Sequence, residues 1–231
     1  MSKYLDTILQ LLAQVARRNE EAIGRAAAVV ASVIEQDGLV YVFGSGHSQL
    51  LAAELHMRAG GLVPIQAIWD PGFGRAERVE GYALSLLEDY EFRPGEAMIV
   101  ISNSGRNPAP VEVALRAKEL GLTVIAVTAV EYSLGQPSRH RSGRRLCEVA
   151  DIVLDTMGVP GDALVPLPGG GAAGPASTVV GAALLNAVVV AAAEELQRRG
   201  QVPPLLQSVN LDGTSNEAVL QRYRGRLRRV L

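Results

Sequence analysis

The chain has 231 residues, of which 48% are hydrophobic, and its formal net charge at pH 7 is -2. This length and apolar content suffice for one large α/β domain, while the balanced charge gives no electrostatic case for nucleic acid or an anionic membrane as the main partner. The single cysteine, Cys147, excludes an intramolecular disulfide and favours a cytoplasmic protein. No cluster of His, Cys and carboxylates has zinc-site spacing, so we expect no required metal and no cofactor.

The N-terminal residues predict helix before any strand. Between Tyr4 and Ile34, apolar side chains recur at steps of three and four, which indicates one long helix or two in tandem. Such a helix must pack on the flank of the sheet or on another chain, so we expect a homodimer or homotetramer. The first twelve residues lack the cleavage site of a secretory signal, and the apolar run 179–193 is shorter than a membrane span.

The first strand is predicted at 39–43 and a helix at 49–57. The turn between them contains two glycines, two serines and one histidine: Gly44, Ser45, Gly46, His47 and Ser48. A helix start has unpaired N–H groups and partial positive charge, glycines let a ligand approach the backbone, and hydroxyls add donors. This turn therefore predicts a cradle for a phosphate group.

The next segment predicts a strand at 62–68, a loop at 69–74 with the only tryptophan, and a helix at 75–90. Asp70 is interpreted as a turn residue because a Pro-Gly pair follows it. The predicted helix carries Glu77 and Glu80.

A second polar turn follows the strand predicted at 97–101. It contains Ser102, Asn103, Ser104, Gly105, Arg106 and Asn107. Asn107 suits the N-cap of the next helix and Pro108 its first position, with the helix completed by 111–120. Hydroxyls, amides and a glycine again lie between a strand and a helix, which predicts a second anion cradle.

The remaining elements are expected in alternation. We predict a strand at 123–128 ending in Thr128, a polar loop at 130–142 with His140 among arginines, and a strand at 151–154. Residues 158–176, rich in Gly and Pro, are too long for a mere connection and predict a mobile or functional loop. Ser177 and Thr178 open a buried helix over 179–199, and the tail from 203 ends in a helix at about 215–229.

Continuously apolar strands that alternate with helices predict a three-layer α-β-α sandwich around a five-stranded parallel sheet. We expect a single domain, with a helical segment at 1–36, an α/β core at 37–200 and a tail at 201–231. Ligands of such sheets bind at the carboxyl ends of the strands, where the strand order changes direction. Both serine turns are predicted at that edge.

Other nucleotide and hydrolase motifs are absent from the sequence. A dinucleotide fingerprint needs a third glycine where this chain has Gln49, and no Gly-Lys-Ser/Thr triplet of a nucleoside-triphosphate loop occurs. The turn at 44–48 also does not match the Gly-x-Ser-x-Gly elbow of serine hydrolases.

The two serine turns together resemble the sugar isomerase (SIS) family of phosphosugar-binding domains. Segments 58–61, 138–146 and 177–179 are most similar to small stand-alone bacterial members of unassigned substrate, often labelled phosphoheptose isomerases. The resemblance implies that a sugar phosphate is bound by the two turns. The expected phosphate ligands are Ser45, Ser48, Ser102, Ser104 and Asn107, with His47 as a further contact and Thr128, Ser177 and Thr178 as weaker candidates.

An aldose–ketose isomerase needs a base to move a proton between adjacent carbons and an acid to open the sugar ring. Glu54, Glu77 and Glu80 are candidate bases, and His140 is the candidate for ring opening, in its own subunit or in a neighbouring one. Arg58 stands ten residues past Ser48, and no histidine follows His140, which departs from the spacing of phosphoheptose isomerases. The identity of the sugar therefore stays open.

Three functions remain from the sequence. The first is a cytosolic phosphosugar isomerase, the second a phosphosugar sensor without catalysis, and the third an amino-sugar-phosphate lyase or etherase.

Overall fold

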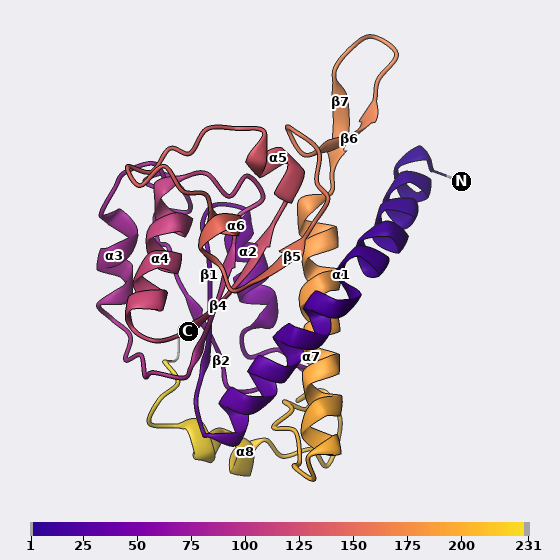
Figure 1. Ribbon diagram of the computed structural model, residues 1–231. Helices are drawn as coiled ribbons and strands as arrows, with labels where there is room; N and C mark the ends of the chain where they lie inside the picture. The colour runs from indigo at the N-terminus through magenta and orange to yellow at the C-terminus, as the bar shows by residue number, and fades with distance from the viewer. Residues whose placement is uncertain (1, 229–231) are drawn as a thin grey trace.

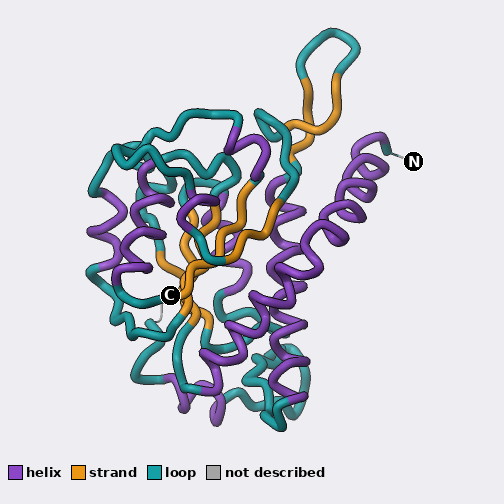
Figure 2. The backbone as a smooth tube through the Cα atoms, viewed as in Figure 1, coloured by secondary structure: helices purple, strands orange, loops and turns teal. Residues whose placement is uncertain are grey.

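A computed structural model describes residues 2–228 and has a five-stranded parallel sheet at its centre (Figures 1 and 2). The strand order is β2-β1-β3-β4-β5. The strands are β1 (Val40–Gly44), β2 (Ile65–Ile68), β3 (Ala97–Ile101), β4 (Thr123–Thr128) and β5 (Ile152–Asp155). The predicted α/β sandwich is confirmed, because helices cover both faces of this sheet.

Side chains alternate between two apolar cores along each strand. Val40 and Val42 point into a core shared with α1 (Lys3–Glu35), α2 (Ser48–Leu55) and α7 (Ser177–Arg198). Tyr41 and Phe43 point into the opposite core, which is covered by α3 (Tyr82–Leu87), α4 (Pro108–Glu119) and α6 (Leu146–Val149). Burial on both faces explains why the strands are continuously apolar.

The order in which the chain adds strands to the sheet reverses between β1 and β3. These strands are adjacent and parallel, with Gly44 opposite Ile101, although β2 lies between them in the sequence. Loops that leave their carboxyl ends therefore diverge around one crevice, the usual ligand position in this strand order. The crevice lies between the two serine turns.

The N-terminal residues form one helix, α1, which settles the choice between one helix and two. At its middle, the Asn19 side chain is buried and pairs with the backbone of the edge strand β5. Asn19 Nδ2 donates to the Asp155 carbonyl at 2.9 Å, and the Asp155 N–H donates to Asn19 Oδ1 at 2.7 Å. One amide side chain thus satisfies both outward backbone groups of Asp155.

Helix α7 is a core helix of the sandwich. In residues 2–228 it is the one helix long and apolar enough, by length and composition alone, to cross a membrane. Leu184 and Leu185 are buried in the core that it shares with α1 and α2. A Cβ at Gly181 would lie 2.5 Å from Leu51 Cδ1, so a larger residue where α7 crosses α2 would displace the Leu51 side chain.

Two predicted segments have a different structure. The helix expected at 75–90 is reduced to α3, because residues 75–81 form turns that end at Gly81, which has a φ of 84°. The loop expected at 158–176 instead contains the hairpin of β6 (Ala163–Pro166) and β7 (Ala172–Pro175), which projects from the body near the N-terminus of α1 (Figure 1).

Smaller differences concern short helices. The loop predicted at 130–142 begins with α5 (Val130–Leu134), and the tail helix, α8 (Glu217–Tyr223), is shorter than the predicted 215–229. Residue 229, the last of that prediction, lies outside the described residues.

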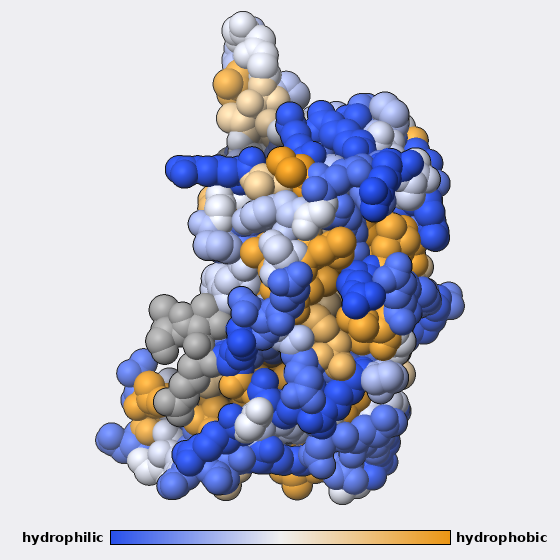
Figure 3. Space-filling model, turned by 90° about the vertical axis from the view of Figure 1, so that its left-hand side faces the viewer, coloured by the Kyte–Doolittle hydropathy of each residue, from blue (hydrophilic) through white to orange (hydrophobic). Residues whose placement is uncertain are grey.

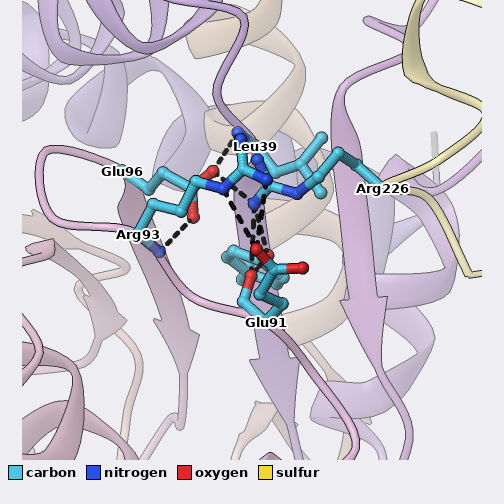
Figure 4. Close-up of polar contacts among 6 residues, drawn as sticks. Leu39, Glu91, Arg93, Glu96 and Arg226 are labelled. Carbon is cyan, nitrogen blue, oxygen red and sulfur yellow. Dashed lines mark hydrogen bonds and ion pairs between the residues drawn. The ribbon is translucent and has the colours of Figure 1, made fainter.

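At the amino end of the sheet, a buried carboxylate fastens the C-terminal tail (Figure 4). Glu96 is 3% exposed and accepts hydrogen bonds from the Leu39 N–H (2.9 Å), the Arg93 N–H (2.8 Å) and Arg226 Nη2 (2.7 Å). Arg226 also donates to the hydroxyl of Tyr41 at 3.3 Å. Burial, together with Glu96 and partly offset by Arg226, raises the pKa of Tyr41 to about 12. We call these residues the tail clamp.

Candidate functional site

A hollow of about 440 Å³ lies at the carboxyl end of the sheet, and both serine turns line it. The first turn contributes Ser45, Gly46, His47 and Ser48, and the second contributes Ser102, Asn103, Ser104 and Asn107. The remaining walls come from segments 73–77, 132, 161–162 and 177. The two turns that the sequence singled out therefore meet around one cavity.

Helices α2 and α7 begin at the hollow, with Ser48 and Ser177 in its lining. The start of α4 also faces it, but Pro108 and Pro110 lack N–H groups and the Ala109 N–H donates to the Glu77 carbonyl at 3.0 Å. At α7, Asp162 Oδ1 accepts the Ser177 N–H at 2.9 Å. The starts of α4 and α7 therefore leave few backbone N–H groups for a ligand.

The first turn is held by Asp70, which the sequence interpretation treated only as a turn residue. Its carboxylate accepts hydrogen bonds from Ser45 Oγ (2.6 Å), Tyr82 OH (2.5 Å) and the N–H groups of Gly74 (2.8 Å) and Gly72 (2.9 Å). Burial acts to raise the pKa of Asp70, but these hydrogen bonds outweigh it and the pKa is lowered. Asp70 is thus an ionised anchor between the first turn and the loop that follows β2.

The second turn is held to the end of β4 through a backbone carbonyl. The Asn103 carbonyl accepts the Ala129 N–H at 3.0 Å and Thr128 Oγ1 at 3.3 Å. Gly105 has a φ of 60°, and a Cβ there would lie 2.7 Å from Thr128 Oγ1, so this turn requires a glycine. Thr128 itself is fully buried and supports the turn from behind without lining the hollow.

Glu77 is the candidate base that the structure brings to the hollow. It lies in the turns before α3, half-buried, and its Oε1 accepts Asn107 Nδ2 at 2.8 Å. Arg139 Nη1 in turn donates to Asn107 Oδ1 at 3.0 Å, so the Asn107 amide positions Glu77 and does not cap α4. Burial raises the pKa of Glu77, although Arg78 and Arg139 partly oppose this.

Several lining groups retain free polar atoms. Among residues 2–228, no side-chain hydrogen bond involves Ser48, Ser104 or His47, and His47 is the one histidine that lines the hollow. The His47 ring lies edge-on to Phe73 with 5.8 Å between ring centroids. Ser177 and Thr178 also line a small extension of the hollow between β3 and the start of α7. These groups are available to a ligand.

Two other candidate bases lie away from the hollow. Glu54 is on α2 and forms an ion pair with Arg58 at 2.8 Å. Glu80 Oε1 accepts the Arg141 N–H at 2.6 Å, and its carboxylate lies 3.5 Å from the Arg141 side chain. Neither residue is in the lining of the cavity.

His140 lies in a separate groove of about 590 Å³ between α3 and α4. Its Nε2 is 3.9 Å from Glu112 Oε1, and its Nδ1 is 2.8 Å from Ser142 Oγ. Figure 3 shows this face, with apolar side chains along a hollowed strip and polar ones on both sides. The side chain is 5% exposed, and His140 does not line the hollow of its own chain.

The sequence interpretation gave no site role to four acidic or aromatic residues of the site: Asp70, Phe73, Tyr132 and Asp162. Asp162 has a left-handed backbone with a φ of 60° and accepts Ser177 Oγ at 2.5 Å. An aspartate directly after a strand at the carboxyl edge was the one available signal, and it applied to Asp70 alone. Within residues 2–228, no group of three or more His, Cys, Asp or Glu side chains is arranged to hold a metal ion.

The match of residues 3–129 to the SIS domain family covers more than half of the chain, which therefore belongs to that family. A UPF0309 protein of Shouchella clausii is 36% identical over 237 residues, spanning 97% of this chain and 96% of the relative.

Two solved structures share the fold. A phosphoheptose isomerase from Francisella tularensis has a TM-score of 0.58 at 19% identity and covers 84% of this chain and 100% of its own. The NanR protein of Vibrio vulnificus, complexed with ManNAc-6P, has a TM-score of 0.54 at 16% identity, over 85% of this chain and 63% of that one.

Proposed function

We propose that the protein binds a sugar phosphate in the hollow and interconverts its aldose and ketose forms. The observation that carries this proposal is the convergence of free serine hydroxyls with a half-buried carboxylate in one cavity. Ser48 and Ser104 supply the hydroxyls, and Glu77 supplies the carboxylate. Membership of the SIS family and the fold shared with a phosphoheptose isomerase support the same substrate class.

In the proposed reaction, Glu77 takes a proton from carbon 2 of the open-chain sugar and returns it to carbon 1. The hydroxyl proton moves from oxygen 2 to oxygen 1 through the enediol, so atoms and charge balance. A base works best when its pKa lies near the operating pH, and burial shifts the pKa of Glu77 in that direction. Asn107 and Arg139 hold the carboxylate in place. The reaction requires neither a metal nor a cofactor.

His47 replaces His140 in this proposal as the group that opens the sugar ring. It would pass a proton between the ring oxygen and the anomeric hydroxyl, which needs a side chain within reach of the bound sugar. His47 lines the hollow, whereas His140 does not.

The decisive experiment is incubation with hexose, heptose and N-acetylhexosamine phosphates in heavy water. Isomerisation incorporates deuterium beside the carbonyl, and the Glu77→Gln variant should lower kcat by roughly 10²- to 10⁴-fold. Glu54→Gln is the matched control and should keep wild-type turnover, because Glu54 pairs with Arg58 outside the hollow. Equal losses in both variants, or label incorporation by Glu77→Gln at the wild-type rate, would reject Glu77 as the base.

A non-catalytic sensor is the second candidate, favoured by the shared fold with NanR, a protein solved with a bound phosphosugar. Thermal stabilisation by a sugar phosphate without label incorporation would support it. Lyase or etherase chemistry would be recognised by the identity of the product.

We further propose that the protein is cytoplasmic, since phosphorylated sugars do not cross membranes unaided. We also propose that it forms a homodimer or homotetramer. Apolar side chains on the outer faces of two helices support assembly: Leu5 and Leu9 of α1 are 50% and 57% exposed, and Val179 and Val190 of α7 are 41% and 57% exposed. Light scattering in solution tests the oligomeric state.

A further inference from the structure

Two serines in the hollow have hydroxyl protons that are already committed. Ser45 Oγ lies 2.6 Å from Asp70 Oδ2, and Ser177 Oγ lies 2.5 Å from Asp162 Oδ2. An ionised carboxylate only accepts hydrogen bonds, so each serine must donate its single proton to it. What Ser45 and Ser177 present to a ligand is therefore a pair of oxygen lone pairs.

The surroundings of each carboxylate fix this direction. Asp70 is 1% exposed, and every other hydrogen bond to its carboxylate also comes from a donor: Tyr82 OH and two backbone N–H groups. Asp162 Oδ1 likewise accepts the N–H groups of Ala176 (3.2 Å) and Ser177 (2.9 Å). To reverse its bond with the serine, either carboxylate would first have to take up a proton, whereas all of its other contacts named here are bonds that it accepts.

Other polar side chains of the hollow, which we name the donor wall by their chemistry, have the opposite polarity. Ser102 Oγ accepts the Gly105 N–H at 3.2 Å, which leaves its own proton free. The hydroxyls of Ser48 and Ser104 have no side-chain partner in residues 2–228. Asn103 Oδ1 accepts Thr156 Oγ1 at 3.2 Å, which leaves the Nδ2 protons for a ligand. This wall offers donors.

We propose that these two walls orient the substrate and select it. The donor wall (Ser48, Ser102, Asn103 and Ser104) receives the phosphate, and the acceptor wall (Ser45 and Ser177) receives hydroxyl or amide N–H groups of the sugar. A phosphate dianion on the acceptor wall would face lone pairs backed by two carboxylates, and like charges repel. Ser45, expected from the sequence to hold phosphate, is thereby assigned to sugar recognition, with Asp70 as its positioning residue.

This inference rests on the proposed binding of a sugar phosphate and narrows the substrate class. The ligand must carry at least two hydrogen-bond donors on the part remote from its phosphate. A site that accepts such donors rejects analogues that lack them, because its own polar atoms are then left unpaired.

The test compares Ser45→Ala with Ser104→Ala, using inorganic phosphate and the sugar phosphate that most raises the wild-type melting temperature. Calorimetric titration should show that Ser104→Ala weakens both ligands by a similar factor, roughly tenfold or more. Ser45→Ala should weaken the sugar phosphate roughly tenfold and leave inorganic phosphate unchanged. Equal weakening of inorganic phosphate by the two variants would overturn the assignment.

If Ser45→Ala does not fold, Ser177→Ala tests the acceptor wall in its place. This variant should likewise bind the sugar phosphate more weakly and bind inorganic phosphate as wild type does. Deoxy analogues of the sugar phosphate sharpen the test. An analogue that lacks the hydroxyl bound by one of these serines should bind wild type weakly, and replacing that serine by alanine should not weaken its binding further. If the serine variants bind every deoxy analogue more weakly than wild type does, by the same factor as the parent sugar phosphate, the acceptor wall does not bind those hydroxyls. Failure of every sugar phosphate to bind wild type would overturn the proposed function as well, a different result from equal weakening.

Discussion

Asp70 and Glu96 are buried carboxylates at opposite ends of the same sheet, and their partners differ. Glu96, in the tail clamp, accepts two backbone N–H groups and a guanidinium, and Arg226 neutralises its charge. Asp70 accepts only uncharged donors, among them the Ser45 hydroxyl at the edge of the hollow.

The difference teaches how one functional group serves two purposes. Where a cation is supplied, the carboxylate fastens two distant segments, here the start of β1 and the C-terminal tail. Where only neutral donors are supplied, as at Asp70, the carboxylate orients the hydroxyl groups that donate to it. Its negative charge is not neutralised there, so its potential extends to the ligand cavity. Stability is therefore expected to depend on Glu96, and ligand selection on Asp70.

The largest expected effect is that of Glu96→Ala. Removal of this carboxylate leaves the Arg226 guanidinium without its counter-charge and the N–H groups of Leu39 and Arg93 without their acceptor, which should lower the free energy of unfolding by about 3–5 kcal/mol. Urea denaturation at pH 7 measures it. Glu91→Ala is the control, because that side chain is 70% exposed and its pair with Arg93 should contribute less than about 1 kcal/mol. Comparable losses in the two variants would contradict the clamp.

Asp70→Ala should have a smaller effect on stability and a larger one on binding. Four donors lose an acceptor, which should cost up to about 3 kcal/mol, and sugar-phosphate affinity should fall more than affinity for inorganic phosphate. The lowered pKa of Asp70 means that its contribution to stability is present above its ordinary pKa of 3.8 and is lost as pH falls below it. The variant should therefore show a weaker acid dependence of urea denaturation than wild type, and an unchanged dependence would argue against an ionised anchor.

The smallest of the three effects concerns alkaline pH and the tail clamp. Tyr41 ionises near pH 10 when unfolded, but its pKa is raised to about 12 in the folded chain. The contribution of Tyr41 to the free energy of unfolding is thus fully present below pH 10. It is lost as pH rises toward 12, which lowers the free energy of unfolding by about 2 kcal/mol. Tyr41→Phe should remove that part of the decline in urea denaturation series, whereas Tyr4→Phe, remote from the clamp, should retain it. Identical alkaline curves for wild type and Tyr41→Phe would disprove the contribution.

The sequence was informative where a pattern is local. The apolar runs 97–101 and 123–128 coincide with β3 and β4, and Gly-Ser turns after such strands were placed correctly at one edge. Glu77 was predicted on a helix and instead occupies a turn, because Gly81 takes a left-handed conformation that ends the preceding chain segment.

Features of the site that depend on contacts between distant parts of the chain could not be predicted from the sequence. The direction of the Ser45 hydroxyl depends on Asp70, 25 residues further along the chain, and no spacing rule relates the two. His140 follows Arg139, which supports the site through Asn107, yet the His140 side chain lies in the separate groove between α3 and α4. A histidine in an arginine-rich loop gave no indication of which side it would take.

The amide of Asn19 has a consequence for how copies of this chain can assemble. A bare edge strand is a template on which a strand from another molecule can dock, the route to strand exchange and fibrils. Asn19 occupies the outward backbone groups of Asp155 just as an incoming strand would, so a strand from another copy could dock at this end of β5 only by displacing the amide. The side chain thereby disfavours open-ended growth along this border of the sheet.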